Sequence, residues 1–101
     1  MLIRYLVRPD RLDEHLTLLT AVYDELARSA PEGLRYVTLR LDDGYTFVDV
    51  VSGPHLPDPL PSLPAFGRFR AGLEERCEQQ EMSEATVLGT YRTGEWLLSD
   101  L

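Results

Sequence analysis

The sequence predicts a small α+β domain whose elements follow the order β-α-β-β-α-β. Three observations lead to this order: an apolar N-terminal run followed by a long helical stripe, a hairpin signal in the middle of the chain, and a second helical pattern followed by a strand-like run. This is the ferredoxin-like arrangement, an antiparallel sheet with both helices on one face. The 101 residues are expected to form one domain, with residues 94–101 as a C-terminal extension.

The first strand and the first helix are predicted within residues 1–33. The run MLIRYLVR is apolar and partly alternating, and Pro9 ends it. Asp10 is expected to cap the helix that follows, because a short acidic side chain accepts hydrogen bonds from the first turn. Pro31 and Gly33 end this helix. Its apolar stripe, with His15 at the edge, consists of Leu12, Leu16, Leu19, Tyr23, Leu26 and Ala30.

Residues 34–52 predict a β-hairpin. Asp43-Gly44 suits a two-residue type I′ turn, which places Arg40 opposite Phe47 and fixes the register. One face is then aliphatic and is expected to pack on the helices; it carries Val37, Leu39, Leu41, Thr46, Val48 and Val50. The other face is mixed and is expected to be bare in a single chain; it carries Tyr36, Thr38, Arg40, Tyr45, Phe47 and Asp49. A bare aromatic patch usually meets a partner, so a homodimer through this mixed face is expected.

Residues 52–66, SGPHLPDPLPSLPAF, hold five of the seven prolines. Prolines limit the freedom of the unfolded chain, and leucines can anchor a loop, so this proline-rich segment is expected to be ordered. We interpret it as a stiff wall beside a cavity, with His55 near the opening and a leucine turned inward, namely Leu56, Leu60 or Leu63. The alternative is a packing strap with no ligand role.

A second helix and a fourth strand are predicted in the C-terminal third. Ser62 is a candidate N-cap, and Phe66, Phe69, Leu73 and Cys77 follow at helical spacing. The acidic run EERCEQQEMSE is interpreted as the solvated end of this helix, and SEATVLGTYRT, residues 83–93, as the last strand. The tail is apolar and is expected to pack against a sheet edge or a partner subunit through Trp96, Leu97 and Leu98.

Composition excludes several classes of function. The net charge is −7, and the chain has no basic run, which argues against a nucleic-acid partner. No apolar stretch approaches the roughly 20 residues that span a bilayer, so a soluble cytoplasmic protein is expected. The single cysteine excludes an intrachain disulfide. Two distant histidines, one cysteine and scattered carboxylates match no metal-ligand spacing, so no metal is expected.

The candidate catalytic residue is His15, because an imidazole near neutral pKa suits proton abstraction from a phenol. Its alternative role is that of a core or surface histidine. Arg40 and Asp49 lie diagonally across the hairpin, either as an interface ion pair or as an anion-binding arginine held by a carboxylate. The full set of candidate ligand contacts is Tyr36, Arg40, Phe47, Asp49, His55, Phe66 and Phe69.

The element order, the segment SAPEGLRYVTLRLDDGYTFVDVV and the aromatic second helix carry a family likeness. Residues 2–93 resemble the dimeric α+β barrel superfamily and, within it, the antibiotic-biosynthesis-monooxygenase-like group. The resemblance implies a homodimer of facing sheets, a small-molecule cavity between each sheet and its helices, and cofactor-free oxidation of aromatic or polyketide-like substrates.

The chain also departs from that group. Active members commonly carry a tryptophan at the end of the third strand and a histidine on the second helix. Here the helix has Phe66 and Phe69 instead. Haem degradation is therefore not expected, and the alternative is a non-catalytic ligand-binding or assembly module of the same fold.

Overall fold

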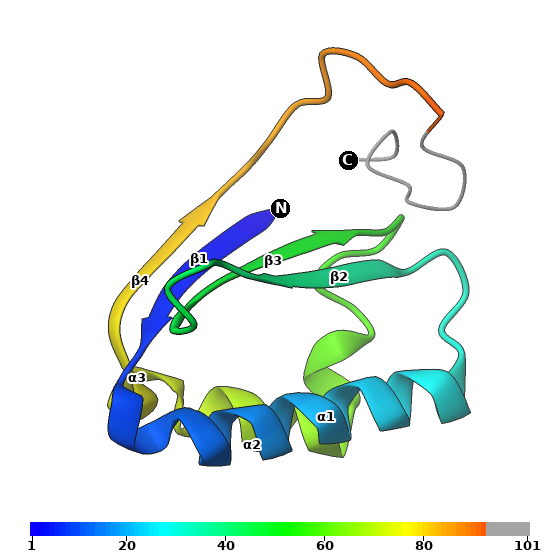
Figure 1. Cartoon of the computed structure of the whole chain (residues 1–101). Coiled ribbons are helices and arrows are strands. Elements are labelled where there is room, and N and C mark those ends of the chain that lie inside the picture. The colour runs from blue at the N-terminus through cyan, green and yellow to red at the C-terminus, as the bar shows by residue number, and fades with distance from the viewer. Residues whose placement is uncertain (93–101) are drawn as a thin grey trace.

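A computed structural model describes residues 1–92 of the chain. Strands β1 (Leu2–Val7), β2 (Arg35–Arg40), β3 (Thr46–Ser52) and β4 (Cys77–Ser83) form one antiparallel sheet in the order β2-β3-β1-β4. Helices α1 (Leu12–Ser29), α2 (Pro64–Ala71) and α3 (Leu73–Arg76) lie on one face of this sheet (Figure 1). The predicted ferredoxin-like α+β class is confirmed. Within residues 1–92, the helices are too short or too polar to cross a membrane.

The start of α1 differs from the prediction. Asp10 lies in a 3-10 turn, Pro9–Arg11, that runs directly into the helix, so Arg11 takes the cap position. Because no side chain caps the helix there, the predicted cap is wrong; instead Arg11 Nε donates to the Glu14 carboxylate at 2.8 Å. The end agrees with the prediction, since Ala30 adopts a left-handed φ of 44° just before Pro31.

The hairpin has the predicted register with a different turn. Arg40 lies opposite Phe47, as expected. The loop is longer, however: Leu41 N–H donates to the Thr46 carbonyl at 2.9 Å, and of the central Asp43-Gly44 pair only Gly44 has a positive φ, 82°. The Asp43 carboxylate accepts from the backbone N–H groups of Tyr45 and Thr46, which stabilises the four-residue loop 42–45. The register is unchanged because the longer loop takes one residue from each strand, Asp42 and Tyr45, which were expected to face each other.

The two faces of the hairpin are reversed relative to the prediction. Phe47 and Asp49, each 1% exposed, lie beneath the helices, and Thr38 Oγ1 hydrogen-bonds to the hydroxyl of Tyr23 on α1 at 2.7 Å. By alternation, the aliphatic residues occupy the face that no helix of the described chain covers. We define this open face by Leu2, Leu6, Val37, Leu39, Val48 and Val50. The expected interface of Tyr36, Arg40 and Phe47 is therefore wrong, because the helices of the same chain cover this face. The polar groups on it can be buried because they form hydrogen bonds with one another.

The C-terminal third also differs. Helix formation stops at Gly72 and again after Arg76, and β4 begins at Cys77, within the acidic run interpreted as a helix end. Residues 84–92, expected to form most of the last strand, contain no regular element. β4 pairs with β1 at the edge of the sheet, where charged side chains reach solvent. The predicted packing of Trp96, Leu97 and Leu98 lies outside the described residues.

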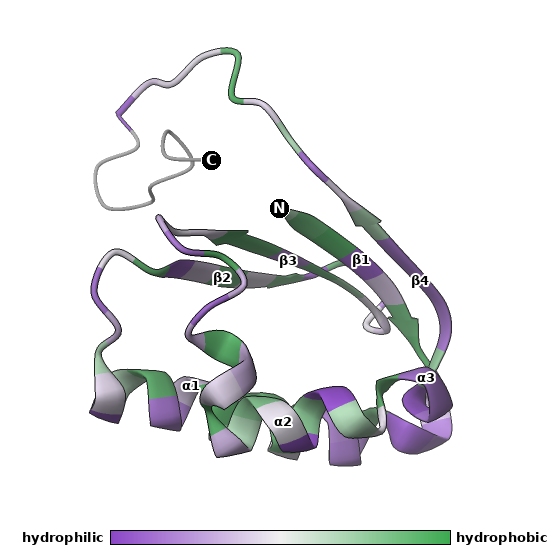
Figure 2. Cartoon of the chain, turned by 180° about the vertical axis from the view of Figure 1, so that it is seen from behind, coloured by the Kyte–Doolittle hydropathy of each residue, from purple (hydrophilic) through white to green (hydrophobic). Residues whose placement is uncertain are grey.

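The core fills the space between the sheet and the helices, and the central strands β1 and β3 are largely apolar in Figure 2. The start of α2 is tied to α1, because the Glu25 carboxylate accepts from Ala65 N–H at 2.8 Å. Ser62 is not the cap of α2; Leu63 holds that position, and Ser62 Oγ donates to the Pro59 carbonyl. The buried apolar cluster consists of Tyr5, Val7, Val22, Phe47, Ala65, Phe69, Leu73 and Cys77.

Candidate functional site

A cavity of about 510 Å³ lies between the sheet, α2 and the proline-rich segment. Its walls are mostly apolar, and only Tyr36 and Arg70 among the lining residues have polar side chains. Each wall comes from a different part of the fold, so the cavity exists only in the folded chain. The apolar lining includes Ile3, Val51, Leu56, Leu60, Phe66 and Met82.

The proline-rich segment forms one wall of this cavity. Its backbone closes successive turns, such as the Leu60 N–H bond to the Pro57 carbonyl at 3.0 Å. Leu56 and Leu60 line the cavity, as their sequence pattern predicts, whereas Leu63 does not. His55 lies in a separate groove of about 340 Å³ with Glu32 and Asp58, so its expected place at the cavity opening is wrong.

A buried carboxylate lies behind Tyr36. Asp49 accepts hydrogen bonds from the hydroxyls of Tyr36 and Tyr5, at 3.2 Å in each case. Burial raises the pKa of Asp49 to about 6, although the bonds from Thr38 and the two tyrosines act in the opposite direction. Burial, followed by the negative charge of Asp49, raises the pKa of both tyrosines above their ordinary range. The tyrosine hydroxyls therefore keep their protons and act as donors.

Arg70 contributes a charged side chain to the cavity lining. Arg70 and Tyr36 both line the cavity, and the positive charge of Arg70 partly offsets the rise that burial and Asp49 cause in the pKa of Tyr36. Within residues 1–92, Arg70 makes no hydrogen bond or ion pair with the protein. Its guanidinium therefore has donors left for a ligand. Helical spacing from Phe66 was the signal that could have found Arg70, because positions i and i+4 share a face.

His15 is buried at the other end of the space between sheet and helices, and it does not line the cavity. Its ring lies 5.0 Å from Phe47 and 5.2 Å from Phe69, and Nδ1 accepts from Arg76 Nε at 3.3 Å. Nε2 has no hydrogen-bond partner within residues 1–92. Burial, followed by the charge of Arg76, lowers the pKa of His15 to about 4. The imidazole is neutral near pH 7, and its position is that of a core histidine.

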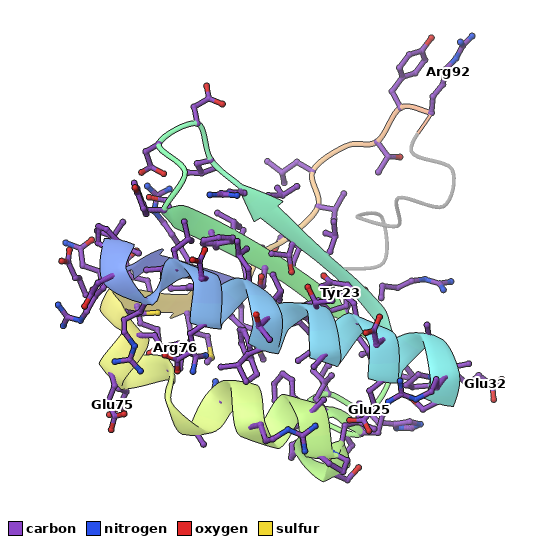
Figure 3. The ribbon with its side chains drawn as sticks, turned by 60° about the horizontal axis from the view of Figure 1, so that its bottom comes forward. Tyr23, Glu25, Glu32, Glu75, Arg76 and Arg92 are labelled. Carbon is purple, nitrogen blue, oxygen red and sulfur yellow. The ribbon has the colours of Figure 1, made fainter. Side chains whose placement is uncertain are left out.

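Arg76 is the cation of that packed region. It is 1% exposed, and its guanidinium donates to the Phe69 carbonyl at 2.6 Å and lies over the Phe69 ring. Figure 3 shows Arg76 below the N-terminal part of α1, with the neighbouring Glu75 pointing outward. These contacts tie α3 to α1 and α2.

The remaining predicted contacts are divided between the core and the surface. Phe66 lines the cavity, whereas Phe47 and Phe69 belong to the buried core. Arg40 is exposed; its Nε donates to the Gly44 carbonyl at 2.9 Å, and the structure shows no ion pair between Arg40 and Asp49. Of the predicted ligand contacts, the cavity therefore brings together Tyr36 and Phe66, with Asp49 directly behind Tyr36.

The chain is thus an α+β domain with a cavity of about 510 Å³ on the helical side of its sheet. No protein-family model and no curated protein matches the chain. A solved structure of a proposed antibiotic biosynthesis monooxygenase from Bacteroides thetaiotaomicron is similar, with a TM-score of 0.70, 20% identity and 86% of each chain covered. Rv0793 from Mycobacterium tuberculosis is similar with a TM-score of 0.65 and 20% identity, over 87% of this chain and 95% of that one. The predicted resemblance is thus confirmed at the level of the fold.

Proposed function

We propose that the protein binds an aromatic or polyketide-like molecule in the cavity and oxidises it as a cofactor-free monooxygenase. The observation that carries this proposal is the presence of the Tyr36 and Arg70 side chains in the otherwise apolar lining of a cavity of about 510 Å³. Ligand pockets are commonly about 300–1,000 Å³ in volume, mostly apolar, with a few placed polar groups. The similarity in fold to a proposed antibiotic biosynthesis monooxygenase supports the reaction type.

The residues of the cavity suit an electron-rich substrate. Without a cofactor, the substrate itself must reduce oxygen, and negative charge on a phenol or enol makes it a better reductant. Arg70 lines the cavity and can stabilise such charge, because hydrogen-bond donors directed at developing charge are effective in a site with apolar walls. Apolar walls such as Phe66 and Leu60 keep water from the bound ring.

The second candidate function is a non-catalytic ligand-binding module. It is favoured by the position of His15 outside the cavity and by a described lining that holds no histidine and no carboxylate. Both functions require ligand binding, and they differ in whether oxygen is consumed.

The test is binding followed by oxygen uptake. The thermal unfolding midpoint is measured with 2-naphthol, and oxygen consumption is then followed with 1,4-dihydroxynaphthalene against its spontaneous oxidation. We expect binding to raise the midpoint, and we expect uptake above the spontaneous rate. Arg70→Gln is expected to lose the enzymatic uptake. Arg68→Gln, an exposed position on the same helix outside the cavity, is the matched control.

Each outcome separates the candidates. Binding without enzymatic uptake by the unaltered protein supports the non-catalytic module. A midpoint that no aromatic compound shifts would contradict both.

We also propose that the protein forms a homodimer through the open face of the sheet. Leu2, Val50 and Val37 occupy neighbouring positions on three adjacent strands, and Arg4, opposite Val48, shares this face. Figure 1 shows the three helices on the opposite side. An uncovered apolar surface on a small domain commonly marks a protein interface, and the family resemblance implies facing sheets.

Sedimentation of the protein at micromolar concentration tests this assembly. Val48→Arg places a second positive charge opposite Arg4 on the open face and is expected to produce monomers. Thr17→Glu, on the exposed side of α1, is the control and is expected to leave the dimer intact. A monomeric unaltered protein would contradict the proposal.

A further inference from the structure

Tyr36 connects the cavity to a buried carboxylate. The residue lines the cavity, and its hydroxyl donates to Asp49 Oδ2 at 3.2 Å. The Tyr5 hydroxyl donates to both carboxylate oxygens, at 3.2 and 3.3 Å. An ionised carboxylate has no proton to return. The single proton of the Tyr36 hydroxyl is therefore committed to Asp49, and the phenolic oxygen has only lone pairs left to offer.

We propose that Tyr36, held by Asp49, accepts a hydrogen bond from a hydroxyl group of the ligand, so that the cavity selects phenols or enols over their methyl ethers. The inference rests on the proposed binding function of the cavity. Tyr36 is the residue that contacts the ligand. Asp49 is a positioning residue, because it does not line the cavity and acts through Tyr36.

The polar groups of the cavity complement each other. A guanidinium can only donate hydrogen bonds, so Arg70 pairs with an acceptor or a negatively charged oxygen. Tyr36, as an acceptor, pairs with a donor. A ligand with a hydroxyl at one position and a carbonyl or anionic oxygen at the other satisfies both. A methyl ether leaves the oxygen of Tyr36 without a partner, and sites built for a hydroxyl reject analogues that lack it.

The surroundings of Asp49 make this selection depend on pH. Its carboxylate faces Tyr5 from β1 and the hydroxyls of Tyr36 and Thr38 from β2. Further groups lie one contact away: Tyr23 and His15 on α1, Arg70 on α2, and Arg76 and Cys77 beyond Tyr5. No described cation lies against the carboxylate, and burial raises its pKa to about 6.

Protonation of Asp49 reverses the hydrogen bond. The carboxylic acid has a proton to donate to the oxygen of Tyr36, which frees the tyrosine proton for the cavity. Tyr36 then presents a donor to the ligand, and a methyl ether becomes as acceptable as a hydroxyl. The preference for the hydroxyl is therefore present above about pH 6 and is lost below it.

The experiment compares 2-naphthol with 2-methoxynaphthalene, whose rings are the same and whose neutral forms persist across this range. Dissociation constants are measured by fluorescence titration at about pH 8 and about pH 5, on either side of the Asp49 transition. At the higher pH, we expect the unaltered protein to bind 2-naphthol about tenfold more tightly, the effect of one lost buried hydrogen bond. At the lower pH, we expect nearly equal affinities.

Three variants assign the effect. Tyr36→Phe is expected to lose the preference at both pH values, and Asp49→Asn to show a ratio that no longer changes with pH. Tyr5→Phe removes the other tyrosine hydroxyl from Asp49 but keeps the bond to Tyr36, so it is the matched control and retains the preference at the higher pH.

Two results would overturn the inference: equal binding of both compounds by the unaltered protein at about pH 8, or an undiminished preference in Tyr36→Phe. If both compounds bind equally, the cavity still binds aromatics and only the hydroxyl selection is wrong. If neither binds, the proposed binding function fails together with the inference.

Discussion

The space between the sheet and the helices has two ends that use similar residues differently. At the packed end, His15, Phe47, Phe69 and Arg76 contact one another and fill the space. At the cavity end, Tyr36, Val51, Leu56, Leu60, Phe66 and Arg70 surround about 510 Å³. Each end combines aromatic rings with one arginine. Residue type therefore does not distinguish the packed end from the cavity end. The two ends differ in how closely the surrounding backbone approaches.

The two ends differ in the length of the connection that joins the strand and helix beside each of them. At the packed end, α3 and β4 follow α2 closely, and Arg76 bonds directly to the Phe69 carbonyl. At the cavity end, the proline-rich segment separates β3 from α2 and supplies a wall of its own. A long connection next to a sheet end is a common place for a binding site.

The largest effect is expected from removing an aromatic ring at each end. Phe47→Ala leaves a hole in the packed end and is expected to lower the free energy of unfolding by about 3–5 kcal/mol. Phe66→Ala enlarges a space that is already open, so its loss is expected to be about 1–2 kcal/mol. Urea unfolding measures both.

The two variants are expected to rank in the opposite order when their affinity for a ligand is measured. Phe66→Ala is expected to weaken 2-naphthol binding more than Phe47→Ala does, measured under conditions where both variants are folded. Equal losses of stability and of affinity in the two variants would show that the two ends are not distinct.

The second effect concerns the buried titratable groups, one near each end. The folded pKa of Asp49 is about 6 and its unfolded value is 3.8, so the native state binds more protons between them and stability falls as pH rises. The folded pKa of His15 is about 4 and its unfolded value is 6.5, so the unfolded state binds more protons and stability rises with pH. The two slopes oppose each other between about pH 4 and pH 6.

Single substitutions are expected to expose each slope. As the pH rises from about 4 to about 6, the unfolding free energy of Asp49→Asn minus that of the unaltered protein should increase by about 2 kcal/mol. The same difference for His15→Gln should decrease by a similar amount. Urea unfolding at a series of pH values measures both differences. Parallel pH profiles for all three proteins would contradict the assignment.

The smallest effect is expected within the proline-rich segment. Leu56 and Leu63 are both half-buried, but only Leu56 lines the cavity. Leu56→Ser is expected to weaken 2-naphthol binding by about threefold to tenfold, because an apolar contact is lost. Leu63→Ser is expected to leave the affinity unchanged, with a similar small loss of stability. If both variants lose only stability, the segment is a packing strap and has no role in binding.

The sequence predicted the elements that depend on local signals. The apolar stripe located α1, and the DDG signal fixed the β2–β3 register even though the turn itself is longer. The alternation showed which residues share a face, but both faces of the hairpin carry large apolar groups. The choice of inner face depends on Asp49 being bonded by Tyr5 and Tyr36, and Tyr5 lies on a different strand.

The lining of the cavity was predicted in part. Leu56, Leu60, Tyr36 and Phe66 were found because the proline-rich segment and the aromatic helix are local features. His15 was selected for its chemistry, yet tertiary packing places it beside Arg76 and away from the cavity. Arg70 was missed although its spacing of four residues from Phe66 places both on one face of α2, because only the packing of α2 on the sheet shows that this face lines the cavity.

The acidic character of β4 has a consequence for aggregation. The outer side of this strand has no strand partner within residues 1–92, so its backbone groups could template the addition of further chains. Glu78 and Glu81 are exposed along it, in a chain of net charge −7. Two such edges repel each other before their backbones can meet. The charged edge therefore disfavours pairing between two copies of β4, whereas the other edge of the sheet, β2, carries Arg35 and Arg40.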